Sequence, residues 1–241
     1  MTDDEIRGHL KSRLQAVEVR IQTACDRAGR SRSEVTLLAV TKTVGIRVAG
    51  ILLELGVPHL AESRPQEFWR KVEALKNPDL HWHLIGHLQR NKIDRCVSYQ
   101  PMLIHSVDSV RLLHALEAEA KKQKRTLSIL LEVNASREEN KQGFPPEQIP
   151  GLQDEISRCS ALQLEGLMTM AAFDVEPEQC RNTFQEVRLL RDRLQDTWRL
   201  PLPRLSMGMS NDFEVAIEEG ATLIRLGTIL FEGLQEDTQS A

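Results

Sequence analysis

The sequence lacks the features that mark secreted, membrane-bound and zinc-binding proteins. Its four cysteines are widely scattered and form no CxxC pair, so neither a disulfide framework nor a cysteine zinc site is indicated. No apolar run approaches the ~18 residues of a membrane span, and the acidic start MTDDEIRGHL has no apolar core of a signal peptide. We therefore expect a cytoplasmic protein with no membrane partner.

The sequence also lacks a dominant sign of charge. Its 31 Lys and Arg residues are balanced by 35 Asp and Glu residues, which argues against nucleic acid as a partner because nucleic-acid-binding proteins normally carry a basic stripe or arm. The one dense basic run, at 121–125, closes a predicted helix, where cations are stabilised by the helix dipole. The motifs GxSxG, HExxH and GxxxxGKS are missing as well, so Ser-His-Asp, zinc-protease and P-loop chemistry have no anchor.

What the sequence does contain is a regular alternation of apolar strands and amphipathic helices. Residues 1–30 predict a helix that covers one end of the core. Strands are predicted at 35–42, 57–61, 81–86, 102–107, 127–134, 162–170, 204–207 and 222–226, with helices between them at 47–55, 65–75, 88–96, 108–122, after 146, at 178–197 and at 212–219. About eight β/α units favour an α/β fold with one domain, a (β/α)8 TIM barrel over 35–231, preceded by the extra N-terminal helix and followed by a polar tail at 235–241. A doubly wound open sheet is the alternative.

Lys42 closes the first predicted strand, and reactive residues of such barrels lie at the carboxyl ends of strands. Strand alternation places Thr36, Leu38, Val40 and Lys42 on one face, so Lys42 is expected to face the barrel interior with the aliphatic residues. An apolar setting disfavours the ammonium form of lysine and leaves an amine able to form an imine. The other interpretation is a lysine that extends to the rim.

The last two strands end in small, polar residues suited to an anion. Gly208 allows close backbone approach, Ser206 and Ser210 supply hydroxyl groups, and the following helix offers free N–H groups. The final strand then delivers Arg225, Gly227 and Thr228. Because phosphate sites in these barrels are commonly built from the loops after strands seven and eight, we predict an anion site here.

The HWHLIGH segment raises the hypothesis of a metal site, because His81 and His83 share one face of a strand. No carboxylate or further histidine is apparent at neighbouring strand ends to complete a ligand set. We therefore predict no metal and favour buried, hydrogen-bonded histidines.

The motifs together carry a resemblance. AVTKT (39–43), WHLIGHLQRNK (82–92), HSVDS (105–109), the N-x-S-x-E-x-x-K-x-G pattern (134–143), GLMTM (166–170) and the segment 206–228 are similar to those of the YggS/PROSC family of pyridoxal phosphate homeostasis proteins. The resemblance implies a barrel like the N-terminal domain of alanine racemase, holding pyridoxal 5'-phosphate (PLP) as an imine on Lys42. It also implies that Ser206, Gly208, Ser210, Gly227 and Thr228 contact the phosphate and that Arg225 lies near the pyridine nitrogen.

Two departures from the family pattern affect the edge of the predicted site. The usual Gly-Glu-Asn after the second strand reads Ala61, Glu62, Ser63, so a shorter hydroxyl replaces an asparagine contact. The usual Phe-Gly after the last strand reads Phe231, Glu232, Gly233. We include Ser63 and His83 among the residues expected around the cofactor.

The first functional hypothesis is a non-catalytic carrier that supports intracellular PLP (vitamin B6) and amino-acid homeostasis, with PLP-dependent apoenzymes as recipients and a monomer or weak dimer as the working form. Related barrel enzymes take essential acid/base groups from a second, β-rich domain, which we do not expect here, and the one tyrosine, Tyr99, is predicted in a helix-strand loop. The alternatives are a small PLP-dependent racemase or lyase, and an aldolase that uses a lysine imine without cofactor. No residue is assigned a catalytic role.

Overall fold

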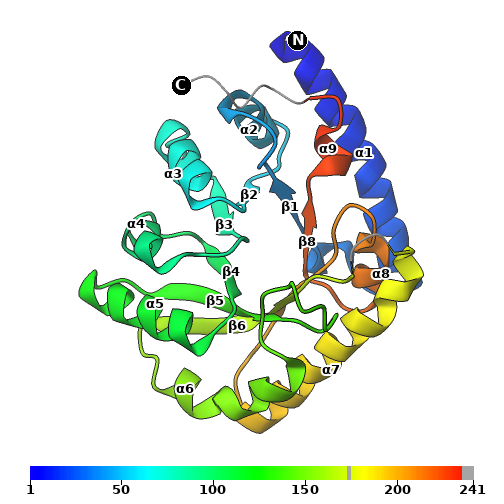
Figure 1. The fold of residues 1–241 in the computed structure, drawn as a ribbon. Helices are drawn as coiled ribbons and strands as arrows, with labels where there is room; N and C mark the ends of the chain where they lie inside the picture. Colours follow the sequence, from blue (N-terminus) through cyan, green and yellow to red (C-terminus); the bar gives the residue numbers. More distant parts are fainter. Residues whose placement is uncertain (173–174, 235–241) are drawn as a thin grey trace.

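The computed structural model describes residues 1–172 and 175–234, and the predicted polar tail at 235–241 lies outside them. The described residues form a closed barrel of parallel strands in the order β1 to β8, surrounded by helices (Figure 1). Its strands are β1 (Thr36–Val40), β2 (His59–Glu62), β3 (His81–Leu84), β4 (Leu103–Val107), β5 (Leu127–Val133), β6 (Leu162–Thr169), β7 (Arg204–Ser206) and β8 (Leu223–Leu226). The pairing of Thr36 with Leu223 and of Ala39 with Leu226 closes the ring between β1 and β8. This closure confirms the TIM barrel and excludes the open sheet.

The helices of the outer layer follow the strands in turn. They are α1 (Asp3–Arg27), α2 (Ile46–Glu54), α3 (Pro65–Ala74), α4 (Ile93–Ser98), α5 (Val110–Lys122), α6 (Gln153–Ser157), α7 (Arg181–Trp198), α8 (Phe213–Glu218) and α9 (Thr228–Phe231). Short 3-10 turns occur at η1 (Arg32–Glu34), η2 (Arg90–Lys92), η3 (Pro146–Leu152) and η4 (Pro177–Cys180). No helix among residues 1–172 and 175–234 combines the length and apolar character needed to cross a membrane.

The strand pattern in the sequence reflects burial on both faces. Alternate residues fill the barrel interior with a small apolar cluster of Leu38, Val40, Ala61, Leu103, Leu130, Met168 and Leu223. The intervening residues, such as Ala39 and Ile224, pack outward against the helices in a much larger core. Parallel strands buried in this way read as nearly continuous apolar runs, which is why the strands were predictable.

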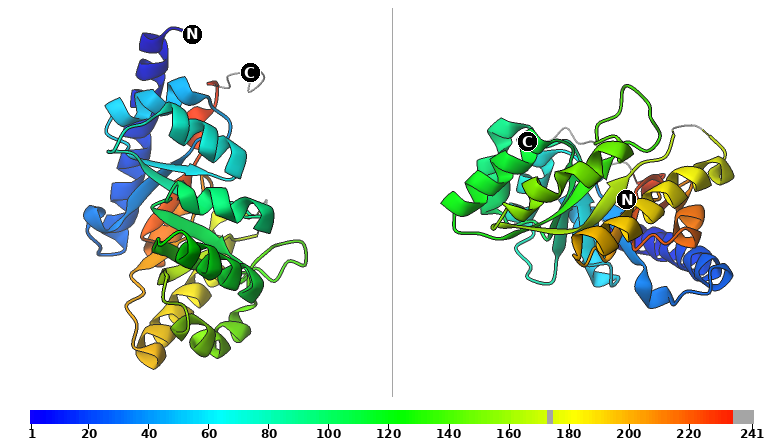
Figure 2. Two further views of the ribbon diagram at one scale, coloured as in Figure 1. Left: turned by 90° about the vertical axis from the view of Figure 1, so that its left-hand side faces the viewer. Right: turned by 90° about the horizontal axis from the view of Figure 1, so that it is seen from below.

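Three local predictions need correction. Helix α1 lies along the side of the barrel, packed against α2, α8 and α9, and does not cover an end of the core (Figures 1 and 2). The helix predicted after residue 146 is mostly the 3-10 turn η3, because Pro150 cannot donate an α-helical hydrogen bond, and only the short α6 follows. The sequence reading also missed α9, which begins directly after β8.

Candidate functional site

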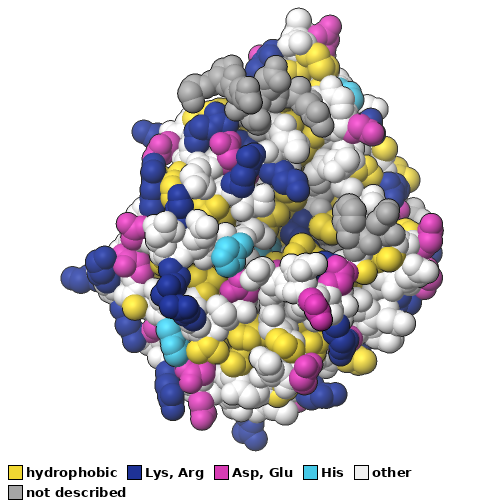
Figure 3. Space-filling model, in the orientation of Figure 1, with side chains coloured by type: hydrophobic (Ala, Val, Ile, Leu, Met, Phe, Trp, Pro, Cys, Tyr) yellow, Lys and Arg dark blue, Asp and Glu magenta, His cyan; other side chains and the backbone are white. Residues whose placement is uncertain are grey.

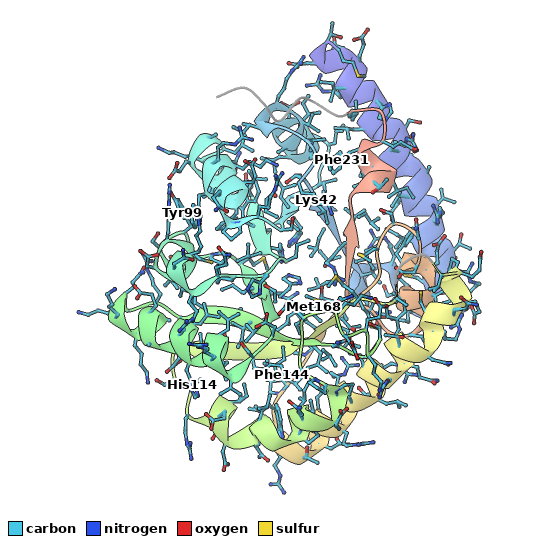
Figure 4. The ribbon with its side chains drawn as sticks, viewed as in Figure 1. Lys42, Tyr99, His114, Phe144, Met168 and Phe231 are labelled. Carbon is cyan, nitrogen blue, oxygen red and sulfur yellow. The ribbon has the colours of Figure 1, made fainter. Side chains whose placement is uncertain are left out.

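Most of the predicted site residues gather at one mouth of the barrel. Strands β7, β8 and β1 are neighbours and parallel, so their carboxyl ends meet there. Lys42 follows β1, Gly208 and Ser210 follow β7, and Gly227 and Thr228 follow β8. Lys42 lies within the ring of strands and helices in Figure 4, and the same view of the surface has a central depression with lysine and arginine side chains around it (Figure 3).

Lys42 lies at this mouth, but its expected burial in an apolar setting was wrong. Strand β1 ends at Val40, and the chain then turns, with the amide of Val44 donating to the carbonyl of Thr41. Lys42 is therefore exposed. Its carbonyl accepts a hydrogen bond from Arg64 at 2.9 Å, and its side-chain amine has no partner among the residues that the structure describes.

The turn after β7 brings the backbone close to the helix that follows. Gly208 has φ +92°, and a Cβ there would lie 2.6 Å from the Cβ of Ala216, so only glycine fits. The hydroxyl of Ser210 accepts a hydrogen bond from the amide of Ile229 at 3.3 Å, which ties this turn to the start of α9. The loops after β7 and β8 thus form one unit.

This pair of loops offers donors for an anion. Within 1–172 and 175–234, the amides of Ser210 and Thr228 have no hydrogen-bond acceptor, and Thr228 is exposed. The start of α8 contributes less than predicted, because the buried carboxylate of Asp212 stands there and accepts from the amide of Met209 at 2.6 Å. Burial raises the pKa of Asp212, partly offset by that hydrogen bond and by Arg225.

Arg225 lies inside the barrel and is only 4% exposed. Its guanidinium donates to the carbonyl and the hydroxyl of Ser206, each at 2.7 Å, and to the carbonyl of Thr169 at 2.9 Å. Burial lowers the pKa of Arg225 to about 10, while Asp212 and Glu132 act in the opposite direction. Arg225 thus remains a cation at neutral pH, although its direct partners among the described residues are all neutral.

The structure changes the predicted roles of Ser206 and His83. Ser206 is fully buried, and its hydroxyl contacts Arg225 and His105 rather than the mouth. His83 is also fully buried, between His59 and His105. Their side chains point into the barrel because strand alternation places these positions on its interior face. Neither side chain reaches the mouth, so direct contact with a ligand there is excluded in this conformation.

Of the three histidines in HWHLIGH, His83 is buried and hydrogen-bonded as favoured from the sequence, whereas His81 is half-buried and its side chain makes no hydrogen bond within residues 1–172 and 175–234. Burial lowers the pKa of His59 to about 4 and that of His83 to about 3, and it places the pKa of His105 well below its ordinary value. His87 is exposed and lies 3.0 Å from Asp108. Residues 1–172 and 175–234 contain no group of three or more His, Cys, Asp or Glu side chains arranged to hold a metal ion.

Two charged groups near the mouth were missed. Glu132 is 4% exposed, and burial, with a contribution from Asp108, raises its pKa to about 7. The sequence did hold a signal, since Glu132 is the one carboxylate in the apolar run 127–133. The second group is the ion pair between Lys71 and Glu62, fully buried at 2.5 Å and joined by Thr41. Nothing in the spacing marks this pair.

Ser63 follows β2 and is half-buried at the same end of the barrel. Its backbone carbonyl packs so closely on Gly86 that a Cβ at position 86 would lie 2.0 Å from the oxygen. The ends of β2 and β3 are thereby held together. No hydrogen bond from the Ser63 hydroxyl is formed within the described residues, so this hydroxyl is available at the rim.

Known proteins resemble the whole of this barrel. Residues 12–235 match the family described as alanine racemase, N-terminal domain. The pyridoxal phosphate homeostasis protein of Aquifex aeolicus is 44% identical over 219 residues, covering 91% of this chain and 96% of its own. An unknown protein from Bifidobacterium adolescentis matches with a TM-score of 0.89 at 34% identity, over 96% of this chain and 98% of its own. The structure of PipY from Synechococcus elongatus with PLP bound matches with a TM-score of 0.80 at 32% identity, over 92% of this chain and 99% of its own.

Proposed function

Because this chain belongs to the pyridoxal phosphate homeostasis protein family, whose barrel is that of the alanine racemase N-terminal domain, we propose that it binds PLP at the mouth of its barrel and serves PLP (vitamin B6) and amino-acid homeostasis. One observation carries the proposal: the exposed side chain of Lys42 lies at the same mouth as the loops after β7 and β8, which offer donors for an anion. The bound PLP of PipY supports it.

The donor set at the mouth fits the chemistry of PLP. Lys42 would hold the aldehyde carbon as an imine, and the backbone of Gly208 and Gly227 with Ser210 and Thr228 would take the phosphate. A Cβ at Gly227 would lie 3.3 Å from the carbonyl of Val40, so this glycine also brings β8 close to the end of β1. When bound, PLP supplies an electrophilic carbon and an electron-withdrawing ring.

Two further residues complete the proposed site. Arg225 would lie toward the pyridine nitrogen, and its fixed charge would disfavour a second positive charge there. Ser63 would contact the ring from the rim. Ser206 and His83, which the structure places in the interior, would act on the site through Arg225.

Lys141 is the rival to Lys42, and its geometry disfavours it. Its ammonium donates to the carbonyl of Ala171 at 2.7 Å, to Glu138 at 2.9 Å and to Ser136 at 3.3 Å. An amine engaged in three hydrogen bonds is less available as a nucleophile than one without partners. Lys42 has no such partners among the described residues.

Reductive trapping tests the assignment. The full chain is incubated with PLP, reduced with borohydride and mapped by peptide mass spectrometry. We expect the pyridoxyl group on Lys42, its loss in Lys42→Ala and its retention in the matched variant Lys141→Ala. A label found mainly on Lys141 would overturn the assignment, and a protein that takes no label and binds no PLP would overturn the function.

The phosphate should carry much of the affinity, because a charge-assisted hydrogen bond to an anion contributes about 1.5 to 3 kcal/mol. Pyridoxal without phosphate is therefore expected to bind at least ~10-fold more weakly, as measured by titration of the visible absorption of the bound aldehyde. Equal affinity of the two compounds would remove the role of the loops after β7 and β8.

We further propose that the bound PLP is stored and delivered without turnover, with PLP-dependent apoenzymes as recipients and a monomer or weak dimer as the working form. A cytoplasmic location is part of the proposal, and it is supported by the four unpaired cysteines, which are typical of a reducing compartment. Tyr99 lies at the end of α4 at the outer layer, bonded to Glu73, and so does not supply a base at the mouth (Figure 4).

The racemase alternative has one group in its favour. Glu132, with its pKa raised to about 7 chiefly by burial, has the properties of an acid/base group. We expect no appreciable loss of the α-deuterium from labelled alanine or other common amino acids. Exchange with inversion at enzyme-like rates, lost in both Lys42→Ala and Glu132→Gln, would show that the protein is an enzyme.

A further inference from the structure

A continuous chain of hydrogen bonds crosses the interior of the barrel from β2 to β8. The rings of His59 and His83 approach at 3.1 Å between Nδ1 and Nε2, and those of His83 and His105 approach at 3.0 Å between the same pair of atoms. The Nδ1 atom of His105 lies 2.8 Å from the hydroxyl of Ser206, which lies 2.7 Å from Arg225. These four hydrogen bonds connect five residues in series, so the chain has two ends, His59 and Arg225.

The Arg225 end fixes the direction of the first two bonds. A guanidinium has donors and no acceptor, so the oxygen of Ser206 must accept from Arg225. If Nδ1 of His105 also donated to this oxygen, the buried hydroxyl proton of Ser206 would have no acceptor among the described residues. Because buried hydroxyl groups are almost always satisfied, Ser206 donates to Nδ1 of His105.

The same reasoning fixes the tautomer of each histidine in turn. The pKa values of all three imidazoles are lowered by burial, so the rings are neutral near pH 7. A neutral imidazole that accepts at Nδ1 carries its proton at Nε2. His105 therefore donates from Nε2 to His83, and His83 donates from Nε2 to His59. Every hydrogen bond in the chain points away from Arg225.

We propose that Ser206, His105 and His83 are positioning residues that hold Arg225 in place for the ligand at the mouth, with all three histidines of the chain locked as Nε2–H tautomers. This inference rests on the proposed function for the identity of the ligand, and on the chain's own geometry for the tautomers. Ser206 is the junction, because its hydroxyl contacts both Arg225 and the ring of His105. Its role is to orient the cation, which accounts for a serine at this strand position that does not face the mouth.

Only one set of hydrogen-bond directions satisfies every group of this chain. Reversing the bond between two of the histidines would reverse every bond as far as Ser206, and the buried hydroxyl proton of Ser206 would then have no acceptor among the described residues. An unsatisfied buried donor of this kind is costly. Arg225 is thus held by acceptors alone: the carbonyls of Ser206 and Thr169 and a hydroxyl whose proton is committed elsewhere.

The tautomers can be measured without any ligand. The full chain is labelled with ¹⁵N-histidine, and long-range ¹H–¹⁵N correlation spectra are recorded near pH 7, with His59, His83 and His105 assigned by single His→Gln variants. We expect an unprotonated Nδ1 and a protonated Nε2 in all three rings. A protonated Nδ1 in His83 or His105 would overturn the inference.

A matched pair of serine variants tests the link to Arg225. Ser206→Ala cuts the chain, whereas Ser106→Ala removes an equally buried hydroxyl of β4 that bonds to the carbonyl of Gly86 outside it. We expect Ser206→Ala to give His105 a mixed tautomer signal and to weaken PLP binding by about fivefold, the effect of one hydrogen bond. Ser106→Ala should leave the tautomers unchanged.

The outcomes separate the two proposals. If PLP binds to both serine variants as to the parent and the tautomers of Ser206→Ala are unchanged, the positioning role is wrong while the proposed function stands. If the tautomers are as stated but no PLP binds to the parent chain, the proposed function fails and the chain remains a structural feature of the barrel.

Discussion

Among residues 1–172 and 175–234, two cations are buried, and they are buried in different ways. Lys71 lies on α3 with its ammonium 2.5 Å from the carboxylate of Glu62 and 2.6 Å from the carbonyl of Thr41, and the side chains of Lys71 and Glu62 are fully buried. Arg225 lies on β8 with only hydroxyl and carbonyl oxygens in direct contact. Lys71 is neutralised locally, whereas the charge of Arg225 is balanced only at a distance by Asp212 and Glu132, which raise its pKa.

This difference agrees with the proposed function, in which Arg225 serves the ligand and Lys71 serves the fold. A buried charge is expensive, and a close counter-ion is the usual way to offset its cost. Lys71 has Glu62 as its close counter-ion, and this ion pair joins α3 to β2. Arg225 has no such counter-ion in direct contact, and under the proposed function the electron-rich ring of PLP would supply a partner for its charge.

The largest expected effect comes from breaking the neutralised pair. Lys71→Met leaves the carboxylate of Glu62 buried without a counter-ion, and we expect a loss of about 3 to 5 kcal/mol in the free energy of unfolding. Urea titration followed by circular dichroism measures it. The double variant Lys71→Met with Glu62→Leu should recover most of the loss, and a single variant that costs under ~1 kcal/mol would contradict the pair's structural role.

The sequence predicted features that depend on neighbouring residues better than contacts between residues far apart in the chain. The barrel was predictable because each strand is a short apolar run. The gathering of the candidate residues at one mouth was predictable because neighbouring strand ends converge there. The exposure of the Lys42 side chain was not predictable, because residue alternation does not reveal that the chain leaves β1 after Val40.

The roles of individual polar residues were harder still. Ser206 and Ser210 are the same residue type four positions apart, yet the hydroxyl of the first contacts His105 in the barrel interior and that of the second accepts from the amide of Ile229 in α9. The pairing of Lys71 with Glu62 joins a helix to a strand, so no local pattern marks it. These contacts arise from tertiary packing, which the spacing of residues along the chain does not encode.

The next effect is a loss of stability in mild acid that originates in the histidine chain. The folded-state pKa values of His59 and His83 are about 4 and about 3, below the ordinary 6.5. The unfolded chain therefore binds more protons as the pH falls below 6.5, and each such proton costs about 1.4 kcal/mol per pH unit. We expect the fully buried His83 alone to lower the free energy of unfolding by about 3 kcal/mol between pH 6.5 and 4. The half-buried His59 adds a smaller loss, because solvent screens its charge.

Glu132 acts in the opposite direction, which gives a control. Its folded-state pKa of about 7 lies above the ordinary 4.5, so its contribution is present below 4.5 and is lost as the pH rises toward 7. The two trends overlap and partly cancel in the parent protein. Glu132→Gln should therefore steepen the acid loss, as measured by urea titrations at several pH values, and an unchanged slope would contradict this balance.

Removing the unneutralised cation should cost less than removing Lys71. Arg225→Met leaves the hydroxyl of Ser206 and the carbonyl of Thr169 short of a donor, but it also relieves the burial of a charge. We expect a loss of about 1 to 3 kcal/mol in the free energy of unfolding. If Arg225→Met proves as costly as Lys71→Met in the same urea titration, the distinction between the two buried cations is wrong.

The smallest effect on stability is expected at the third cation of the region, Lys42. Its amine is exposed and has no partner among the described residues, so Lys42→Ala removes no buried contact of the charge, and surface changes of this kind stay within about 0.5 kcal/mol. The same substitution should abolish covalent attachment of PLP. The matched control is Lys11→Ala, which alters an exposed lysine of α1 far from the mouth in sequence. It should change neither the free energy of unfolding nor the covalent attachment of PLP. A Lys42→Ala protein that unfolds much more easily than the parent in urea would mean that the amine holds a structural contact, and that its availability for chemistry has been misjudged.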